Sequence, residues 1–172
     1  GNDTLLGGNG DDVLHGGDGD DFIDGSGGAD FALLGNGSDT FRWDPGDGSD
    51  IVEGQAGIDT LRFNGSAGSE IFEVSPNGGR ALLTRNLGNI VMDLNDVERL
   101  EIQALGGTDS IIVNSLAGTD AKQVAVDLGV GGVGDSQIDT VTVNGSNGSN
   151  SINLSLLGGD LSIAGATAQV TI

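Results

Sequence analysis

The fold is decided by residues 7–24, which read GGNGDDVLH followed directly by GGDGDDFID. The same nine-residue pattern begins again at Gly25, Leu34, Pro45 and Gly54, and residues 1–6 have the form of the end of an earlier copy. The sixth position of the six copies is always an aspartate: Asp12, Asp21, Asp30, Asp39, Asp50 and Asp59. A short period repeated this often is the signature of a coiled, solenoid-like fold.

Each copy has a glycine-rich half and an apolar half. In the first half, glycines permit positive φ and close approach of the backbone, so carbonyl oxygens can gather near the Asp carboxylate. Such oxygen donors suit Ca²⁺, which accepts ~6–8 of them at ~2.3–2.6 Å. In the second half, a short strand would direct one apolar residue inward and its two neighbours outward. Two copies of nine residues therefore make one coil with a turn on each side.

The repeat resembles the haemolysin-type calcium-binding nonapeptide repeat of RTX proteins. The resemblance covers residues 1–62 and implies a right-handed parallel β-roll that holds Ca²⁺ between turns stacked one coil apart. It also implies a secreted bacterial protein that leaves the cell by type I secretion. The residues expected to bind the metal are Asp3, Gly8, Gly10, Asp12, Gly17, Gly19, Asp21, Gly28, Asp30, Gly35, Gly37, Asp39, Gly46, Gly48, Asp50, Gly57 and Asp59.

Stacking of alternate copies assigns the turns to two flanks. One flank receives residues 7–12, 25–30 and 45–50, and the other receives 1–3, 16–21, 34–39 and 54–59. Successive turns on each flank predict about five calcium sites. The first two glycine positions are imperfect in the third copy, which has Ser26, and in the fourth, which has Leu34 and Gly35. The fifth copy begins with Pro45. We therefore expect the best sites between the second, third and fourth copies and weaker occupancy toward Pro45.

Two insertions widen the roll. The spacing between key acidic residues grows from nine to eleven after Asp39 and again after Asp59. Both insertions fall on the same sheet, one coil apart, so Trp43 should lie above Phe63 inside the roll. This register makes Trp43 a core residue rather than a platform for sugar stacking.

Residues 63–172 keep the alternation of strand-like runs with Gly, Asn and Asp turns. Two degenerate copies of the repeat carry Glu70 and Asn150 in place of the key Asp. We therefore divide the chain into a calcium roll at 1–62 and a wider parallel β-helix at 63–172. A small antiparallel β-sandwich is the alternative for the second part. The fragment 169–172 reads as an uncapped strand, which could pair end to end with another chain.

The composition excludes several classes of partner. The net charge is −20, from 26 acidic and 6 basic residues, which argues against nucleic acid and fits bound cations. The chain has no Cys and therefore neither disulfides nor thiolate metal sites. No apolar run reaches membrane-spanning length. Because the sequence starts within a repeat, we expect a piece of a larger secreted protein whose export signal lies outside it.

Outside the repeats, Asp135 and Asp139 could hold another Ca²⁺ with Asp127 or Asp109, or they could form a solvated acidic turn. The single histidine, His15, is expected to face outward rather than to serve as a catalytic residue or zinc ligand.

An enzymatic interpretation has little support. The chain has no Cys nucleophile and no Gly-x-Ser-x-Gly motif, and Glu98 and Glu101 fit the solvent face of a strand better than an acid–base pair. We therefore expect a calcium-binding structural module that folds on calcium binding outside the cell. An accessory module that binds a polysaccharide or protein partner is the alternative, and an active site on the β-helix part is the third.

Overall fold

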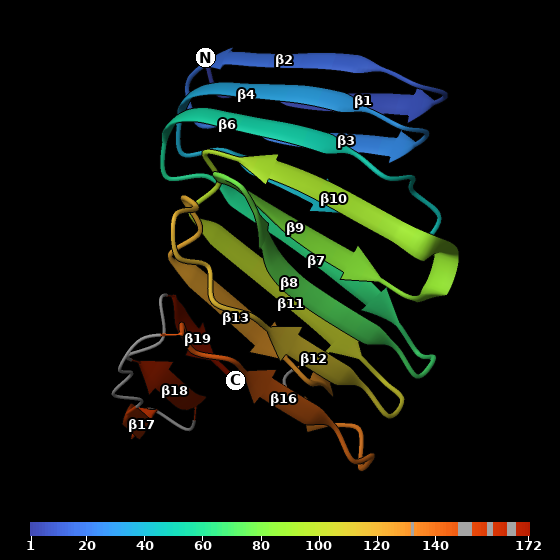
Figure 1. The fold of residues 1–172 in the computed structure, drawn as a ribbon. Helices are drawn as coiled ribbons and strands as arrows, with labels where there is room; N and C mark the ends of the chain where they lie inside the picture. The colour runs from blue at the N-terminus through green and yellow to red at the C-terminus, as the bar shows by residue number, and fades with distance from the viewer. Residues whose placement is uncertain (132, 148–152, 158–159, 165–167) are drawn as a thin grey trace.

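The computed structural model describes residues 1–172 except 132, 148–152, 158–159 and 165–167. Within these residues the chain is almost entirely β-structure, and the one 3₁₀ turn is η1 (Leu87–Asn89). No helix in the described part of the chain is long and apolar enough to cross a membrane. Figure 1 shows the strands stacked as rungs in two facing sheets, with the chain running from the N-terminal coils at the top to the C-terminus at the bottom.

The two sheets take alternate strands of the repeat. The first sheet has the order β1 (Thr4–Asn9), β3 (Phe22–Gly27), β5 (Thr40–Trp43), β7 (Thr60–Ser66), β11 (Arg99–Leu105), β13 (Gln123–Asp127), β19 (Gln169–Thr171), β18 (Asp160–Ala164) and β17 (Asn153–Leu157). The second has the order β16 (Thr140–Val143), β12 (Ser110–Val113), β8 (Ile71–Asn77), β9 (Arg80–Arg85), β10 (Ile90–Asn95), β6 (Ile51–Gly57), β4 (Phe31–Gly37) and β2 (Val13–Asp18). A small hairpin joins β14 (Gly129–Val130) to β15 (Val133–Gly134).

The pairing register confirms the parallel β-roll. Leu5 pairs with Ile23, and Leu14 pairs with Ala32, each one coil of 18 residues later. The same parallel pairing continues from β3 through β5, β7, β11 and β13 to β19, and from β8 through β12 to β16. The roll thus passes into a parallel β-helix without a break in the first sheet.

Aromatic side chains fill the roll where it widens. Phe41 pairs with Leu61 and Trp43 with Phe63, as the spacing of the insertions predicts. The Trp43 and Phe63 rings stack with centroids 4.1 Å apart, and Phe72 meets Phe63 edge to face at 5.9 Å. Trp43 is fully buried and donates its indole N–H to the carbonyl oxygen of Gly48 (2.8 Å), so its place in the core is confirmed.

The second sheet departs from continuous parallel coiling at one point. Strands β8, β9 and β10 form an antiparallel meander, and β10 then pairs in parallel with β6. Gly78 and Gly88, both at positive φ (66° and 79°), lie in the two reversals that this meander requires. The meander places β9 and β10 between β6 and β8 in the second sheet (Figure 1). A plain succession of coils does not include this antiparallel insertion.

The C-terminal end also differs from expectation. Strand β19 is not an open edge, because it pairs in parallel with β13 and antiparallel with β18. The degenerate copy that contains Asn150 lies largely outside the described residues. End-to-end association through residues 169–172 therefore loses the free edge on which the prediction depended.

Candidate calcium site

The turns of alternate copies lie above one another on the two edges of the roll, and the same hydrogen bond recurs in each successive pair. In every case the backbone N–H of a key Asp donates to the Oδ1 of the equivalent Asp in the next coil. The bonds run from Asp3 to Asp21 (2.7 Å), Asp21 to Asp39 (2.7 Å), Asp39 to Asp59 (2.9 Å), Asp12 to Asp30 (2.8 Å) and Asp30 to Asp50 (2.9 Å). We call these two rows the aspartate ladders.

The second carboxylate oxygen of most ladder residues has no hydrogen-bond partner. Burial leaves Asp21, Asp30, Asp39 and Asp59 no more than 3% exposed. The buried oxygens without a partner include the Oδ2 atoms of Asp12, Asp21, Asp30, Asp39 and Asp59. An ionised carboxylate buried without compensation is strongly unfavourable, so this arrangement requires a cation or protons.

Backbone carbonyl oxygens lie beside the free Oδ2 atoms of Asp12, Asp21 and Asp59. The first glycine of a turn shows where they meet: a Cβ built on Gly16 would lie 2.7 Å from Asp21 Oδ2 and 2.1 Å from the carbonyl oxygen of Leu34. Carboxylate and carbonyl oxygens that converge in this way fit Ca²⁺. No three acidic or histidine side chains of the described residues form a metal cluster by themselves, so backbone carbonyls must supply the other ligands.

The glycines expected to bind the metal lie in these same turns. Those at positive φ are Gly8, Gly10, Gly17, Gly19, Gly28, Gly35, Gly37, Gly46 and Gly57. Ser26 and Gln55 stand at the second position of their copies and adopt the same left-handed region, with φ of 60° and 73°. The turn geometry therefore survives where glycine is replaced, at the cost in strain that a side chain brings there.

Burial raises the pKa of four ladder residues, Asp30, Asp39, Asp50 and Asp59, when no cation is bound. Desolvation is the main cause, and it raises the pKa values of Asp50 and Asp59 to about 7. The neighbouring carboxylates in the ladder, Asp30 for Asp50 and Asp39 for Asp59, raise them further, while the hydrogen bonds from the same residues' N–H groups act in the opposite direction. The turns thus discourage negative charge unless an ion compensates it.

The sign of the pH dependence follows from these shifts. In calcium-free buffer, the pKa values of Asp50 and Asp59 are about 7 in the folded chain, above their ordinary range when unfolded, so the folded state binds more protons between the two. This contribution is fully present below the ordinary pKa and is lost as the pH rises through about 7. We therefore expect the calcium-free fold to gain stability from about pH 8 to about pH 5.

Saturating calcium should reverse that trend, because protons then compete with the ion for the same oxygens. Circular dichroism of the strand content at both pH values, with and without calcium, measures the two slopes. Slopes of the same sign would contradict this account.

The rows of acidic side chains continue beyond the nonapeptides. The Asp59 N–H donates to Glu98 Oε2 (2.9 Å), the Glu70 N–H to Asp109 Oδ1 (2.8 Å), and the Asp109 N–H to Asp139 Oδ1 (2.9 Å). The expectation that Glu98 belongs to the solvent face of a strand is therefore wrong, because Glu98 precedes β11 and caps a turn. Glu101 does lie on the outer face, where it pairs with Arg62.

A buried arginine side chain neutralises Glu70. Its carboxylate forms a buried ion pair with Arg85 of β9, and Arg85 also lies 5.3 Å over the Trp43 ring. Glu70 Oε2 additionally accepts the N–H of Ser66 (2.7 Å). In this degenerate copy a guanidinium therefore neutralises the acid at the key position.

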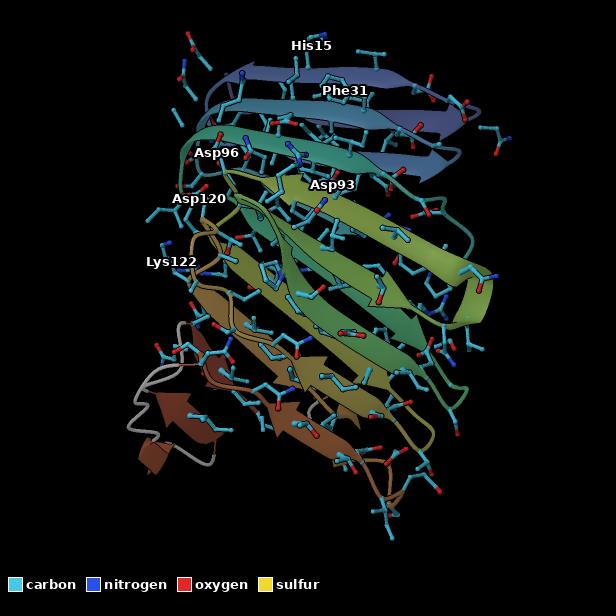
Figure 2. The ribbon with its side chains drawn as sticks, viewed as in Figure 1. His15, Phe31, Asp93, Asp96, Asp120 and Lys122 are labelled. Atoms are coloured by element: carbon cyan, nitrogen blue, oxygen red, sulfur yellow. The ribbon has the colours of Figure 1, made fainter. Side chains whose placement is uncertain are left out.

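The remaining candidates accept backbone N–H groups, Asp127 within its own turn and Asp135 also from a turn 28 residues earlier. Asp135 accepts the N–H groups of Gly107 and Gln137, and these bonds lower its pKa. Asp127 accepts the N–H of Gly129 (2.9 Å). His15 is exposed on β2 at the N-terminal end of the roll, as Figure 2 shows.

Comparison with known proteins identifies the repeat. The model of the RTX calcium-binding nonapeptide repeat matches the chain in 4 copies, over residues 1–32 and 45–62. No curated protein sequence matches the chain. Among solved structures, the extracellular lipase LipA from Serratia marcescens is similar at 15% identity, over 99% of this chain and 37% of the lipase chain. Its TM-score of 0.27 supports no inference about this chain.

The fourth copy falls between the matched segments. It contains Leu34 in place of the first glycine, yet β4 pairs in register with β2 and β6, and Asp39 occupies its place in the ladder. The repeat is therefore continuous in the structure from the first coil to β7. Residues 1–32 and 45–62 of the roll belong to the RTX calcium-binding nonapeptide repeat family.

Proposed function

We propose that this chain is a calcium-binding structural module of a secreted bacterial protein, exported by type I secretion and folded by Ca²⁺ outside the cell. The observation that carries the proposal is the row of buried Asp Oδ2 atoms without partners, with backbone carbonyl oxygens beside those of Asp12, Asp21 and Asp59. About five ions would lie between successive turns, as the ladder pairs suggest. The module supplies a calcium-dependent fold and no catalytic group of its own.

The affinity of such sites would let the module fold when it passes from the cytosol to the outside of the cell. Extracellular calcium modules bind at Kd values of ~10⁻⁴–10⁻³ M, far above cytosolic calcium. In the cell the aspartates would remain uncompensated, and outside it the binding free energy would become folding free energy. This mechanism requires only the ladder residues that the sequence and register bring together.

Loss of the ladder charge on one flank should lower the calcium count. In a double variant, Asp21→Asn and Asp39→Asn, the amide oxygen can still accept the backbone N–H, but the anionic Oδ2 is gone. We expect the folded chain to bind about two to three fewer ions, because these residues contribute to every turn pair on that flank. Equilibrium dialysis followed by elemental analysis gives the count.

The matched control is Asp11→Asn with Asp20→Asn. These exposed residues stand one position before ladder aspartates and accept the N–H groups of Ala29 and Ser38 through Oδ1. They carry the same charge but are not among the buried unpartnered oxygens. An equal loss in the control, or an unchanged count in the ladder variant, would refute the assignment of ligands.

A further inference from the structure

The turn between β10 and β11 takes the place of another repeat turn on one edge of the roll. Asn95 pairs with Glu53, so the following residue, Asp96, stands level with Gly54 at the start of the sixth copy. Asp96 has a positive φ of 50°. Only Val97 then separates it from Glu98, so the turn is much shorter than residues 54–59.

This short turn keeps the two groups that the other turn pairs share, a carboxylate that accepts the N–H of the facing Asp and a backbone carbonyl oxygen. Glu98 Oε2 accepts the N–H of Asp59 at 2.9 Å, the distance at which Asp59 Oδ1 accepts the N–H of Asp39. The extra methylene of Glu98 offsets the shorter turn. The carbonyl oxygen of Asp96 corresponds to that of Leu34, which faces Gly16 two turn pairs earlier.

An unpartnered buried oxygen points into the space between the two turns. Asp59 is 0% exposed, and its Oδ2 has no hydrogen-bond partner. A Cβ built on Gly54 would lie 2.7 Å from Asp59 Oδ2 and 1.7 Å from the carbonyl oxygen of Asp96. At Gly16 the corresponding distances, to Asp21 Oδ2 and to the Leu34 carbonyl oxygen, are 2.7 Å and 2.1 Å.

The surroundings are acidic and lack a compensating side chain. Asp59 lies close enough to Glu98 and Asp96 to experience their charges, and Asp96 lies beside Asp120. None of the ion pairs between described residues includes any of these four acids. The nearby Lys122 directs its ammonium to the carbonyl oxygen of Thr119 (2.8 Å). Figure 2 shows Asp96, Asp120 and Lys122 following one another down one edge.

We propose that a further Ca²⁺ binds where the roll meets the β-helix, between Asp59 Oδ2, the carbonyl oxygen of Asp96 and the carboxylate of Glu98. Carboxylate and carbonyl oxygens are the ligands that Ca²⁺ prefers. The site adds one ion to those between nonapeptide turns, and it joins residues 39 positions apart, beyond the last matched repeat. It rests on the proposed calcium-binding function and extends it to the β-helix part.

The variant Glu98→Gln tests this site in the whole chain. Its amide oxygen can still accept the Asp59 N–H, but the anionic ligand is lost, so we expect one calcium ion fewer than in the parent. The control Glu101→Gln makes the same charge change three residues later in β11, where the carboxylate pairs with exposed Arg62. The control should bind as many ions as the parent. Equilibrium dialysis with elemental analysis provides all three counts.

Crystals of the unmodified chain grown in calcium give a second test that does not depend on how Glu98→Gln folds. Anomalous scattering should show an ion between Asp59 and the Asp96 carbonyl oxygen. Ions in the ladders without one at this position, or equal counts for Glu98→Gln and the parent, would overturn this inference and leave the proposed function intact. A parent chain that binds no calcium would overturn both.

Discussion

Removal of calcium is expected to unfold the first coils of the roll while the widened core keeps its strands. In the N-terminal coils the inward-facing Leu5 and Leu14 are only partly buried. Phe41, Trp43 and Phe63 are fully buried and pack without help from an ion. We therefore expect calcium to stabilise the part of the chain that has the least apolar burial.

The size of the effect follows from mass action. When free calcium is about tenfold above Kd, each site contributes about 1.4 kcal/mol. About five sites then supply roughly 7 kcal/mol, which is comparable with the whole stability of an ordinary domain, ~5–15 kcal/mol. Without that contribution the repulsion between ladder carboxylates remains uncompensated.

Hydrogen exchange read by mass spectrometry, in EDTA and in millimolar calcium, resolves the two parts. Peptides from residues 1–39 should lose protection in EDTA, and peptides from residues 71–105 should keep most of theirs. Magnesium at the same concentration is the control, because it prefers an octahedral site with several waters and should restore little. Equal protection of residues 1–39 with and without calcium would disprove the calcium-dependent fold.

The variant Arg85→Met is expected to destabilise the β-helix part by about 3–5 kcal/mol, because it leaves a buried carboxylate without its cation. Glu70 and Arg85 are 0% and 7% exposed as side chains. Methionine keeps most of the apolar length of the arginine side chain, so lost charge pairing dominates the effect. Urea denaturation in saturating calcium measures the change in the free energy of unfolding.

Two further variants separate charge from packing. Adding Glu70→Gln to Arg85→Met removes the stranded charge and should recover part of the loss. Arg62→Met breaks the exposed pair with Glu101, whose side chains are 43% and 32% exposed, and should cost less than about 1 kcal/mol. Similar losses of unfolding free energy for Arg85→Met and Arg62→Met would show that the buried pair contributes no more to stability than the exposed pair.

The roll could be predicted from sequence because its contacts are periodic. Aspartates 18 or 20 residues apart assign the register of the strands, and the insertions place Trp43 over Phe63. The meander of β8, β9 and β10 could not be predicted, because alternating apolar residues look the same in parallel and antiparallel strands. In this part of the chain the spacing of the repeat no longer indicates which strands pair with each other.

The site beyond the repeat was missed for a related reason. Glu98 caps Asp59 across 39 residues, and its turn contains none of the glycines that mark the other turns. The pairing of Arg85 with Glu70 likewise depends on the meander, which brings β9 beside β8. The signal that was available is modest: an acid directly before a strand-like run, as in Glu98-Arg99-Leu100, repeats the order of Asp59-Thr60-Leu61.

The aspartate ladders give the roll a polarity. Each Oδ1 accepts the N–H of the turn one coil earlier in the chain, as in the bond from Asp21 to Asp39, and no bond of this kind runs the other way among the described ladder residues. The ladder bonds therefore all point one way, whereas the exposed Asp11 and Asp20 accept the N–H groups of Ala29 and Ser38 in the coil that follows them. Replacement of one ladder aspartate by alanine therefore frees the N–H of the ladder residue before it, while its own N–H still donates to the residue after it, as in the row Asp3, Asp21, Asp39.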